Sequence, residues 1–81
     1  MRVKVQLFAV ARERARQSVV DLDLPEQATV AALKKSLAEA CPSLAPMVSV
    51  LRVAVNSEYA ADSQVISPGA ELAVIPPVSG G

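Results

Sequence analysis

The sequence predicts a single two-layer α+β domain in which one helix packs across a mixed, largely apolar sheet. Three observations lead to this prediction. Apolar and polar residues alternate with period two in residues 2–8 and 18–24, an apolar repeat of helical spacing occupies residues 30–40, and short apolar runs return toward the C-terminus. The apolar face of such a sheet and the apolar stripe of the helix cover each other. With 81 residues, the chain is long enough for one hydrophobic core but not for two.

The N-terminal part predicts two strands. Residues 2–8 form the first strand, because every second side chain is apolar. Residues 9–16 are good helix formers, but the segment is short, so a turn or one short helical winding is expected. Residues 18–24 form the second strand, and the short separation favours a hairpin with the first.

One helix is predicted over residues 30–40. Thr29 stands at its N-cap, where its hydroxyl can accept a hydrogen bond from an amide of the first turn. Pro42 ends the helix, because the residue before a proline avoids the helical conformation. The stripe expected to face the sheet consists of Val30, Leu33, Leu37 and Ala40.

The rest of the chain predicts an irregular connection and two further strands. Two prolines in residues 42–49 forbid a long element there. Apolar residues alternate in 51–55, turn residues occupy 56–58 and 67–71, and the apolar run 72–75 is typical of a buried central strand. The predicted order is therefore strand, strand, helix, strand, strand.

The composition argues against several classes of function. Eight basic residues balance eight acidic ones, which disfavours a protein that gains its affinity from the nucleic-acid backbone. There is no histidine and only one cysteine, so neither a Cys-His or Ser-His pair nor a zinc site can be assembled. Cys41 cannot form an intramolecular disulfide, and no signal peptide or membrane-length apolar run is evident, which together favour the cytoplasm.

Several polar or reactive residues are expected to be structural. Asp21 and Asp23 should solvate one face of a strand, and Cys41 should pack as a small hydrophobe rather than act as a reactive thiol. A basic cluster, interrupted by one acid, is more consistent with solvated surface than with a docking patch. It consists of Arg12, Arg14 and Arg16.

The C-terminal segment predicts a different role. Residues 76–81 are expected to form a flexible extended tail outside a domain of residues 1–75. Two prolines hold such a segment extended and lower the entropy cost of inserting it into a partner. The final two glycines lack Cβ atoms and can thread a narrow channel, which would present the Gly81 carboxylate to another enzyme. A carboxylate reacts only after it receives a leaving group, and adenylation by ATP is the usual biological source.

The tail and the opening of the chain together resemble the small subunits of molybdopterin synthase. Residues 76–81, Pro-Pro-Val-Ser-Gly-Gly, are similar to the Pro-Pro-Val-x-Gly-Gly ending of that family. Phe8-Ala9 followed by Arg12-Glu13 resembles its Phe-Ala-x-x-Arg-Glu opening. The resemblance spans the whole chain, but Arg14-Ala15-Arg16 stands where many relatives are more apolar.

The resemblance implies a β-grasp (ubiquitin-like) fold, with the first and last strands adjacent and parallel at the sheet centre and both chain ends at one edge. It also implies a sulfur carrier. A ubiquitin-activating-like adenylyltransferase would use ATP to adenylate Gly81, and a sulfur-donating enzyme would convert the acyl-adenylate into a thiocarboxylate. The sulfur would then pass to cyclic pyranopterin monophosphate to make molybdopterin, in molybdenum cofactor biosynthesis.

The resemblance further implies a partner, the large subunit of molybdopterin synthase, in a heterotetramer that contains two small chains. The acid–base and substrate-binding groups would belong to the large subunit, while the small chain would bind no cofactor or metal. Gly81 would be the one reacting residue, and Ser79 would have no chemical role. The residues expected to bind partners are Phe8, Pro76, Pro77, Val78, Ser79 and Gly80.

Three alternatives stay open at this point. A thiamine-pathway sulfur carrier shares the fold and the chemistry, but it tends to be shorter and usually lacks the Pro-Pro-Val segment before the terminal glycines. A ubiquitin-like protein modifier would instead join Gly81 to a lysine of a target protein. A plain interaction domain with an accidental Gly-Gly ending would retain its function after the two glycines are deleted.

Overall fold

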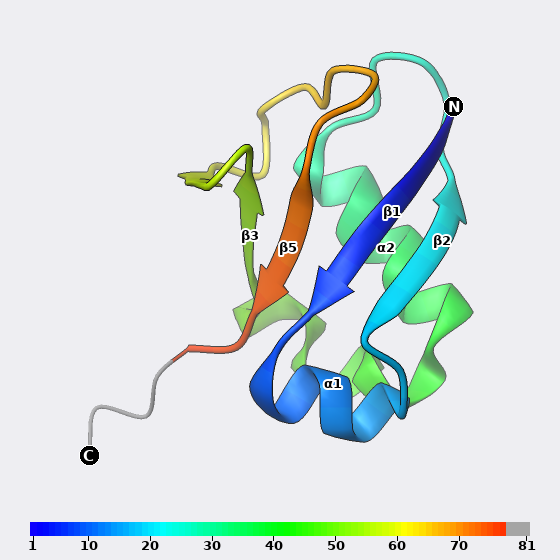
Figure 1. Cartoon of the computed structure of the whole chain (residues 1–81), viewed down its shortest axis with the longest axis vertical. Coiled ribbons are helices and arrows are strands. Elements are labelled where there is room, and N and C mark those ends of the chain that lie inside the picture. Colours follow the sequence, from blue (N-terminus) through cyan, green and yellow to red (C-terminus); the bar gives the residue numbers. More distant parts are fainter. Residues whose placement is uncertain (78–81) are drawn as a thin grey trace.

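The computed structural model describes residues 1–77, which form a β-grasp fold with helices on one face of a five-stranded sheet (Figure 1). This confirms the predicted α+β class. In chain order the elements are β1 (Arg2–Leu7), α1 (Ala9–Ala15), β2 (Val19–Asp23), α2 (Val30–Ala40), the 3₁₀ segment η1 (Pro42–Val50), β3 (Arg52–Val55), β4 (Glu58–Ala60) and β5 (Leu72–Ile75).

The sheet has the strand order β2-β1-β5-β3-β4. The first and last strands, β1 and β5, are adjacent and parallel near its centre, as predicted, and every other neighbouring pair is antiparallel. Both chain ends were expected at one edge; the C-terminal end lies outside the described residues, but the last strand finishes at the end of the sheet opposite the N-terminus. Parallel neighbours start at the same end of a sheet, so β5 finishes beside Leu7, at the end opposite Met1 (Figure 1).

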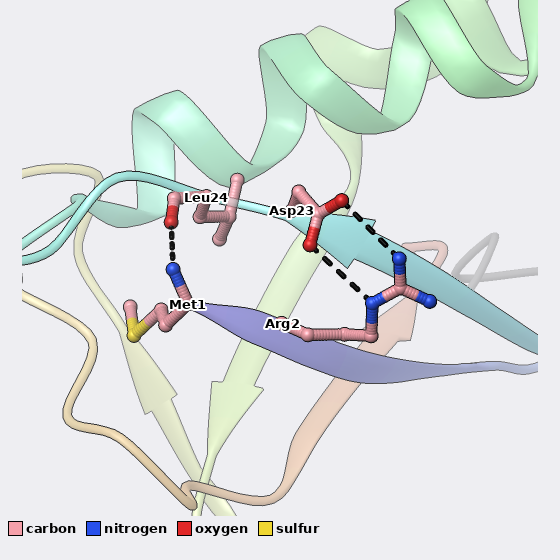
Figure 2. Close-up of polar contacts among 4 residues, drawn as sticks. All are labelled: Met1, Arg2, Asp23 and Leu24. Atoms are coloured by element: carbon pink, nitrogen blue, oxygen red, sulfur yellow. Dashed lines mark hydrogen bonds and ion pairs between the residues drawn. The ribbon is translucent and has the colours of Figure 1, made fainter.

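The pairing of β1 with β2 follows from their alternating pattern. Both strands bury every second residue, so their apolar side chains face the helices and their polar side chains face outward. At the start of β1, the amino group of Met1 donates to the carbonyl of Leu24 (Figure 2). The amide of Leu24 donates in turn to the carbonyl of Met1 at 2.7 Å. On the outer face, Arg2 donates two hydrogen bonds to the carboxylate of Asp23 (Figure 2). They run from Nε to Oδ1 and from Nη2 to Oδ2, and each is 3.3 Å long.

The helix α2 has the predicted bounds and the predicted cap. The hydroxyl oxygen of Thr29 accepts from the amide of Ala32 at 3.3 Å. Two further amides of the first turn, which have no partner within a helix, donate to the segment after β4. These bonds run from Val30 to the carbonyl of Gln64 at 2.9 Å and from Ala31 to the carbonyl of Asp62 at 3.0 Å.

The core lies between α2 and the sheet and contains no large aromatic ring. Three of the four residues of the predicted stripe are buried, but Ala40 is exposed. It is the last residue of the helix, and the next residue, Cys41, is buried in its place. Side chains with less than 2% exposure include Val5, Leu7, Val30, Leu33, Leu37, Leu44, Leu51, Val53, Ile66 and Val74.

Three short elements are additions to the sequence prediction. The segment predicted as a turn or one winding is the helix α1, which buries Ala11 completely and ends where the amide of Arg16 donates to the carbonyl of Arg12 at 2.9 Å. The segment predicted to be irregular is 3₁₀, begins at Pro42, includes Pro46 and buries Leu44. The three-residue strand β4 makes a fifth strand at the sheet edge.

Candidate functional site

The chain leaves the sheet at the end of β5. Pro76 is buried and Pro77 is exposed, so the path out of the body begins at a proline that packs against it. Both residues border a hollow together with Arg52 and Tyr59, which come from β3 and β4. The other predicted site residues lie outside the described residues, and these are Val78, Ser79, Gly80 and Gly81.

The sheet face opposite α2 carries a row of cross-strand neighbours that spans four strands. The register pairs Gln6 with Ala73, Ala73 with Ala54, and Ala54 with Tyr59. A second row lies nearer to the tail, where Ile75 pairs with Arg52. Phe8 extends this second row, because its amide donates to the carbonyl of Val74 at 3.2 Å just after β1 ends.

These two rows border a largely apolar hollow of about 390 Å³ on the open sheet face. The small side chains of Ala54 and Ala73 line it together with Phe8, Tyr59 and Ile75. Its polar lining residues are Gln6, Ser57 and Glu71. Phe8 is 42% exposed and Tyr59 is 63% exposed, although large apolar and aromatic side chains usually gain stability from burial. Exposed aromatic rings beside a hollow are typical of a surface that binds a partner.

Local backbone geometry places the two aromatic rings. Phe8 precedes Ala9, whose φ of 52° lies in the left-handed region that a non-glycine residue rarely adopts. Tyr59 follows a two-residue turn at Asn56 and Ser57, with φ of 51° and 71°, which suits a tight hairpin. The Asn56 side-chain oxygen accepts from the amide of Glu71 at 2.9 Å and thereby ties this hairpin to the segment before β5.

Arg52 lies beside the root of the tail. Its guanidinium carbon is 5.5 Å from the centre of the Tyr59 ring, within the range of a cation–π interaction. Both side chains are exposed, and both border the hollow that contains Pro76 and Pro77. The stacked pair therefore presents a fixed positive charge next to the exit of the chain.

The β1–β2 side of the open face is charged instead. Lys4 lies 3.3 Å from Asp21, and Arg2 lies 3.3 Å from Asp23, so each acid faces a basic residue across the two strands. These exposed pairs confirm that the two aspartates solvate a strand face. Exposed pairs of this kind contribute between about 0 and 1 kcal/mol.

The described residues offer no catalytic constellation. Within residues 1–77, no group of three His, Cys, Asp or Glu side chains could hold a metal ion. Cys41 is 5% exposed, and its sulfur lies 3.6 Å from the side-chain nitrogen of Gln17, so it packs in the core as predicted. In the same part of the chain, no helix has the length and apolar character needed to cross a membrane.

The structure brings together Phe8, Pro76 and Pro77, three of the residues predicted to bind a partner, around the end of β5. Ile75, Tyr59 and the two alanines that line the hollow were not predicted from the sequence. A signal for them exists in β5, whose residues 72–75 are apolar on both faces, whereas β1 is apolar on one. An apolar outer face on a central strand indicates that another surface covers it.

Comparisons with known proteins agree on one family. The model of the ThiS family matches residues 5–81. The molybdopterin synthase sulfur carrier subunit of Arabidopsis thaliana is 39% identical over 79 residues, which cover 98% of this chain and 82% of the relative.

Among solved structures, SAMP1 of Haloferax volcanii, a small archaeal modifier protein, is 34% identical with a TM-score of 0.89 over 100% of both chains. A chain from the complex of subunits 1 and 2 of the molybdopterin-converting factor of Helicobacter pylori shares the fold at 18% identity, with a TM-score of 0.68 over 100% of both chains.

Proposed function

The chain belongs to the ThiS family, and from this membership we propose that it is the sulfur carrier subunit of a molybdopterin synthase. The observation that carries the proposal is its likeness along nearly its whole length to curated sulfur carrier subunits of that enzyme, which are 32–39% identical. The family match extends through Gly81. The absence of histidine from the sequence agrees with a chain that is modified and used by other enzymes.

In the proposed cycle, Gly81 carries the sulfur. Its carboxylate oxygen attacks the α-phosphate of ATP in the activating enzyme, pyrophosphate leaves, and an acyl-adenylate forms. Sulfur at the oxidation level of hydrosulfide, which a donor enzyme supplies together with a reducing thiol, then displaces AMP and leaves a thiocarboxylate. In the large subunit, the thiocarboxylate sulfur attacks a carbon of cyclic pyranopterin monophosphate, and a carbon–oxygen bond at that carbon breaks. Water then cleaves the acyl carbon–sulfur bond, which returns the Gly81 carboxylate and leaves the sulfur on the product, so two loaded chains supply the two dithiolene sulfurs. The chain itself binds no cofactor in this cycle, because the activating enzyme uses the ATP.

The large subunit of the synthase is the proposed docking partner, in a heterotetramer with two small chains. The hollow and the exposed rings beside it support this proposal, because they extend over the open face as far as Ile75, where β5 ends and the tail leaves the sheet. A partner that covers Phe8, Ile75 and Tyr59 would also receive the segment after Pro77. The buried, unpaired Cys41 agrees with a cytoplasmic location, where thiols stay reduced.

Replacing Phe8 or Tyr59 by alanine is expected to weaken binding to the large subunit. Each ring is exposed and borders the hollow, and truncation of an aromatic anchor typically costs about 2 kcal/mol or more, which is roughly 30-fold in Kd. Isothermal titration calorimetry with the purified large subunit measures the effect. Val50→Ala is the matched control, since Val50 is 54% exposed but belongs to the helix layer. Equal Kd values for all three variants would contradict docking through the open face.

A protein modifier is the second candidate function, because the similar structures include small archaeal modifier protein 1. Both functions use the same adenylated Gly81 and differ in the nucleophile that takes the place of AMP. In a modifier it is the amine of a target lysine, and in a sulfur carrier it is sulfur. Expression of an affinity-tagged chain distinguishes them. A ladder of covalent conjugates that withstands denaturation and reducing agents would support the modifier function.

The proposed function is tested by reconstitution. The chain is incubated with ATP, its activating enzyme and a sulfur source, and then with the large subunit and cyclic pyranopterin monophosphate. Molybdopterin should form in proportion to the loaded chain, and it should not form when the chain or ATP is omitted. If a fully loaded chain gave no product with an active large subunit, the proposed function would be wrong.

A further inference from the structure

Charge is distributed unevenly over the folded chain, although its net charge is zero. The ion pairs of the described residues use Arg2, Lys4 and Lys34 but none of the four remaining arginines. All four of these arginines are exposed, and within residues 1–77 none of them lies within 4 Å of an acidic group. We call them the arginine rim, which consists of Arg12, Arg14, Arg16 and Arg52.

The arginine rim lies at the end of the sheet from which the tail leaves. Arg52 is paired in register with Ile75, the last residue of β5, and it borders the hollow that contains Pro77. The helix α1, which carries the other three arginines, begins two residues after Leu7, the neighbour of Val74. Figure 1 shows α1 beside the end of β5, at the end of the sheet opposite the N-terminus.

Most acidic residues are elsewhere or already paired. Asp21, Asp23 and Asp62 each lie within 3.3 Å of a basic side chain. Glu58 and Glu71 lie toward the other end of the sheet, since Val55 pairs with Glu58 and also with Leu72, the first residue of β5, and Glu71 borders the far side of the hollow. Glu13 stands among the arginines on the same short helix, and Glu39 lies near this end in the last turn of α2, two residues before Cys41, which contacts Gln17. Because the four arginines outnumber these two acids, the exposed charge at the tail end is positive on balance.

Arg12, Arg14 and Arg16 were expected to be solvated surface, but their position at the tail end with Arg52 favours a role in docking. We propose that the arginine rim recognises carboxylate side chains that border the opening through which the large subunit receives the tail. This inference rests on the proposed function and adds the chemistry of the partner's surface. A guanidinium offers a planar set of donors that can bind a carboxylate through two parallel hydrogen bonds. The cation–π contact with Tyr59 holds the Arg52 group beside the apolar hollow, so the charged contact continues the docking surface.

A protein surface fits the arginine rim better than a nucleic acid. A polyanion that extended from the rim over the open face would meet Glu71, which borders the hollow, and Glu58, which precedes Tyr59 in β4. A protein partner can place acidic side chains opposite the rim and other side chains opposite the hollow and the two glutamates. The field of the arginine rim would also orient the tail toward its opening, and steering of this kind raises association rates by about 10-fold to 1,000-fold at low salt.

The test measures association kinetics between the full chain and the large subunit by stopped-flow fluorescence at low and high ionic strength. Arg14→Glu and Arg52→Glu each change the net charge by the same amount as the control Lys35→Glu. Lys35 is exposed on α2, in the helix layer and beside η1. Arg14→Glu leaves the cation–π contact intact, and Arg52→Glu removes it, so two independent positions probe the arginine rim.

Each reversal in the arginine rim is expected to lower the association rate about 10-fold at low salt and to flatten its salt dependence, whereas Lys35→Glu should change the rate by less than about twofold. If the wild-type chain binds the large subunit and all three variants associate at the same rate, the docking role of the arginine rim is wrong but the proposed function stands. A wild-type chain that fails to bind the large subunit would overturn the proposed function. A third outcome is that the chain binds a single-stranded RNA tightly, both reversals abolish this binding, and association with the large subunit is unchanged. The arginine rim would then bind a nucleic acid rather than an acidic protein surface.

Discussion

Replacing Gly81 by valine is expected to reduce sulfur transfer by more than about 100-fold, the scale of loss that follows from misplacing a reacting group by about 1 Å. The valine side chain would widen the segment that threads the partner's channel and would shift the carboxylate from the position where adenylation occurs. The free energy of unfolding should change by less than about 0.5 kcal/mol, as for substitutions outside a core. Molybdopterin formation in the reconstituted reaction and urea unfolding measure the two quantities.

Ser79→Ala is the control for this substitution, since Ser79 occupies the variable position of the Pro-Pro-Val-x-Gly-Gly ending. It should transfer sulfur at close to the wild-type rate. Two results would contradict the account. One is a Gly81→Val variant that transfers sulfur normally, and the other is a variant that loses stability in proportion to its activity.

Leu33→Ala is expected to have the opposite pattern, with a large loss of stability and intact chemistry in the molecules that stay folded. Leu33 is fully buried in α2, at the centre of the layer that covers the sheet. Removing its side chain leaves a cavity, and buried leucine-to-alanine changes cost about 2–5 kcal/mol. This is a large share of the roughly 5–15 kcal/mol that stabilises a domain. Urea unfolding of the purified variant measures the loss.

Lys35→Ala is the matched control for the core substitution, because Lys35 lies on the same helix but is exposed. It should change the free energy of unfolding by less than about 0.5 kcal/mol. Per folded molecule, Leu33→Ala should accept sulfur at the wild-type rate at low temperature. If Leu33→Ala lowered the free energy of unfolding by less than about 1 kcal/mol, the Leu33 side chain would not be packed in the core in the way that the structure shows.

The main elements of the fold could be predicted because their signals are local. Period two in β1 and β2, the Thr29 cap and the helical repeat of α2 each follow from contacts within a few residues. The additional elements depend on distant contacts. The helix α1 is seven residues long and is held by the burial of Ala11, while β4 is three residues long and needs β3 as its partner. Patterns in a single segment do not contain that information.

The site could be predicted only in part for the same reason. The Gly-Gly ending and Phe8 stand out in the sequence through their resemblance to a known family. Tyr59 does not, because it reaches the open face only through the register of β3 with β4 and β5. The arginines illustrate the limit most clearly. Arg52 is 36 positions from Arg16, and only the topology of the sheet places both at the end from which the tail leaves.

The most direct test of the central claim is the intact mass of the chain after incubation with ATP, its activating enzyme and a sulfur source. Conversion of the Gly81 carboxylate into a thiocarboxylate exchanges one oxygen atom for one sulfur atom, so the mass should rise by about 16 Da. Fragmentation should assign the increase to the C-terminal residue. An unchanged mass in the presence of an activating enzyme that adenylates the chain would contradict the sulfur carrier function.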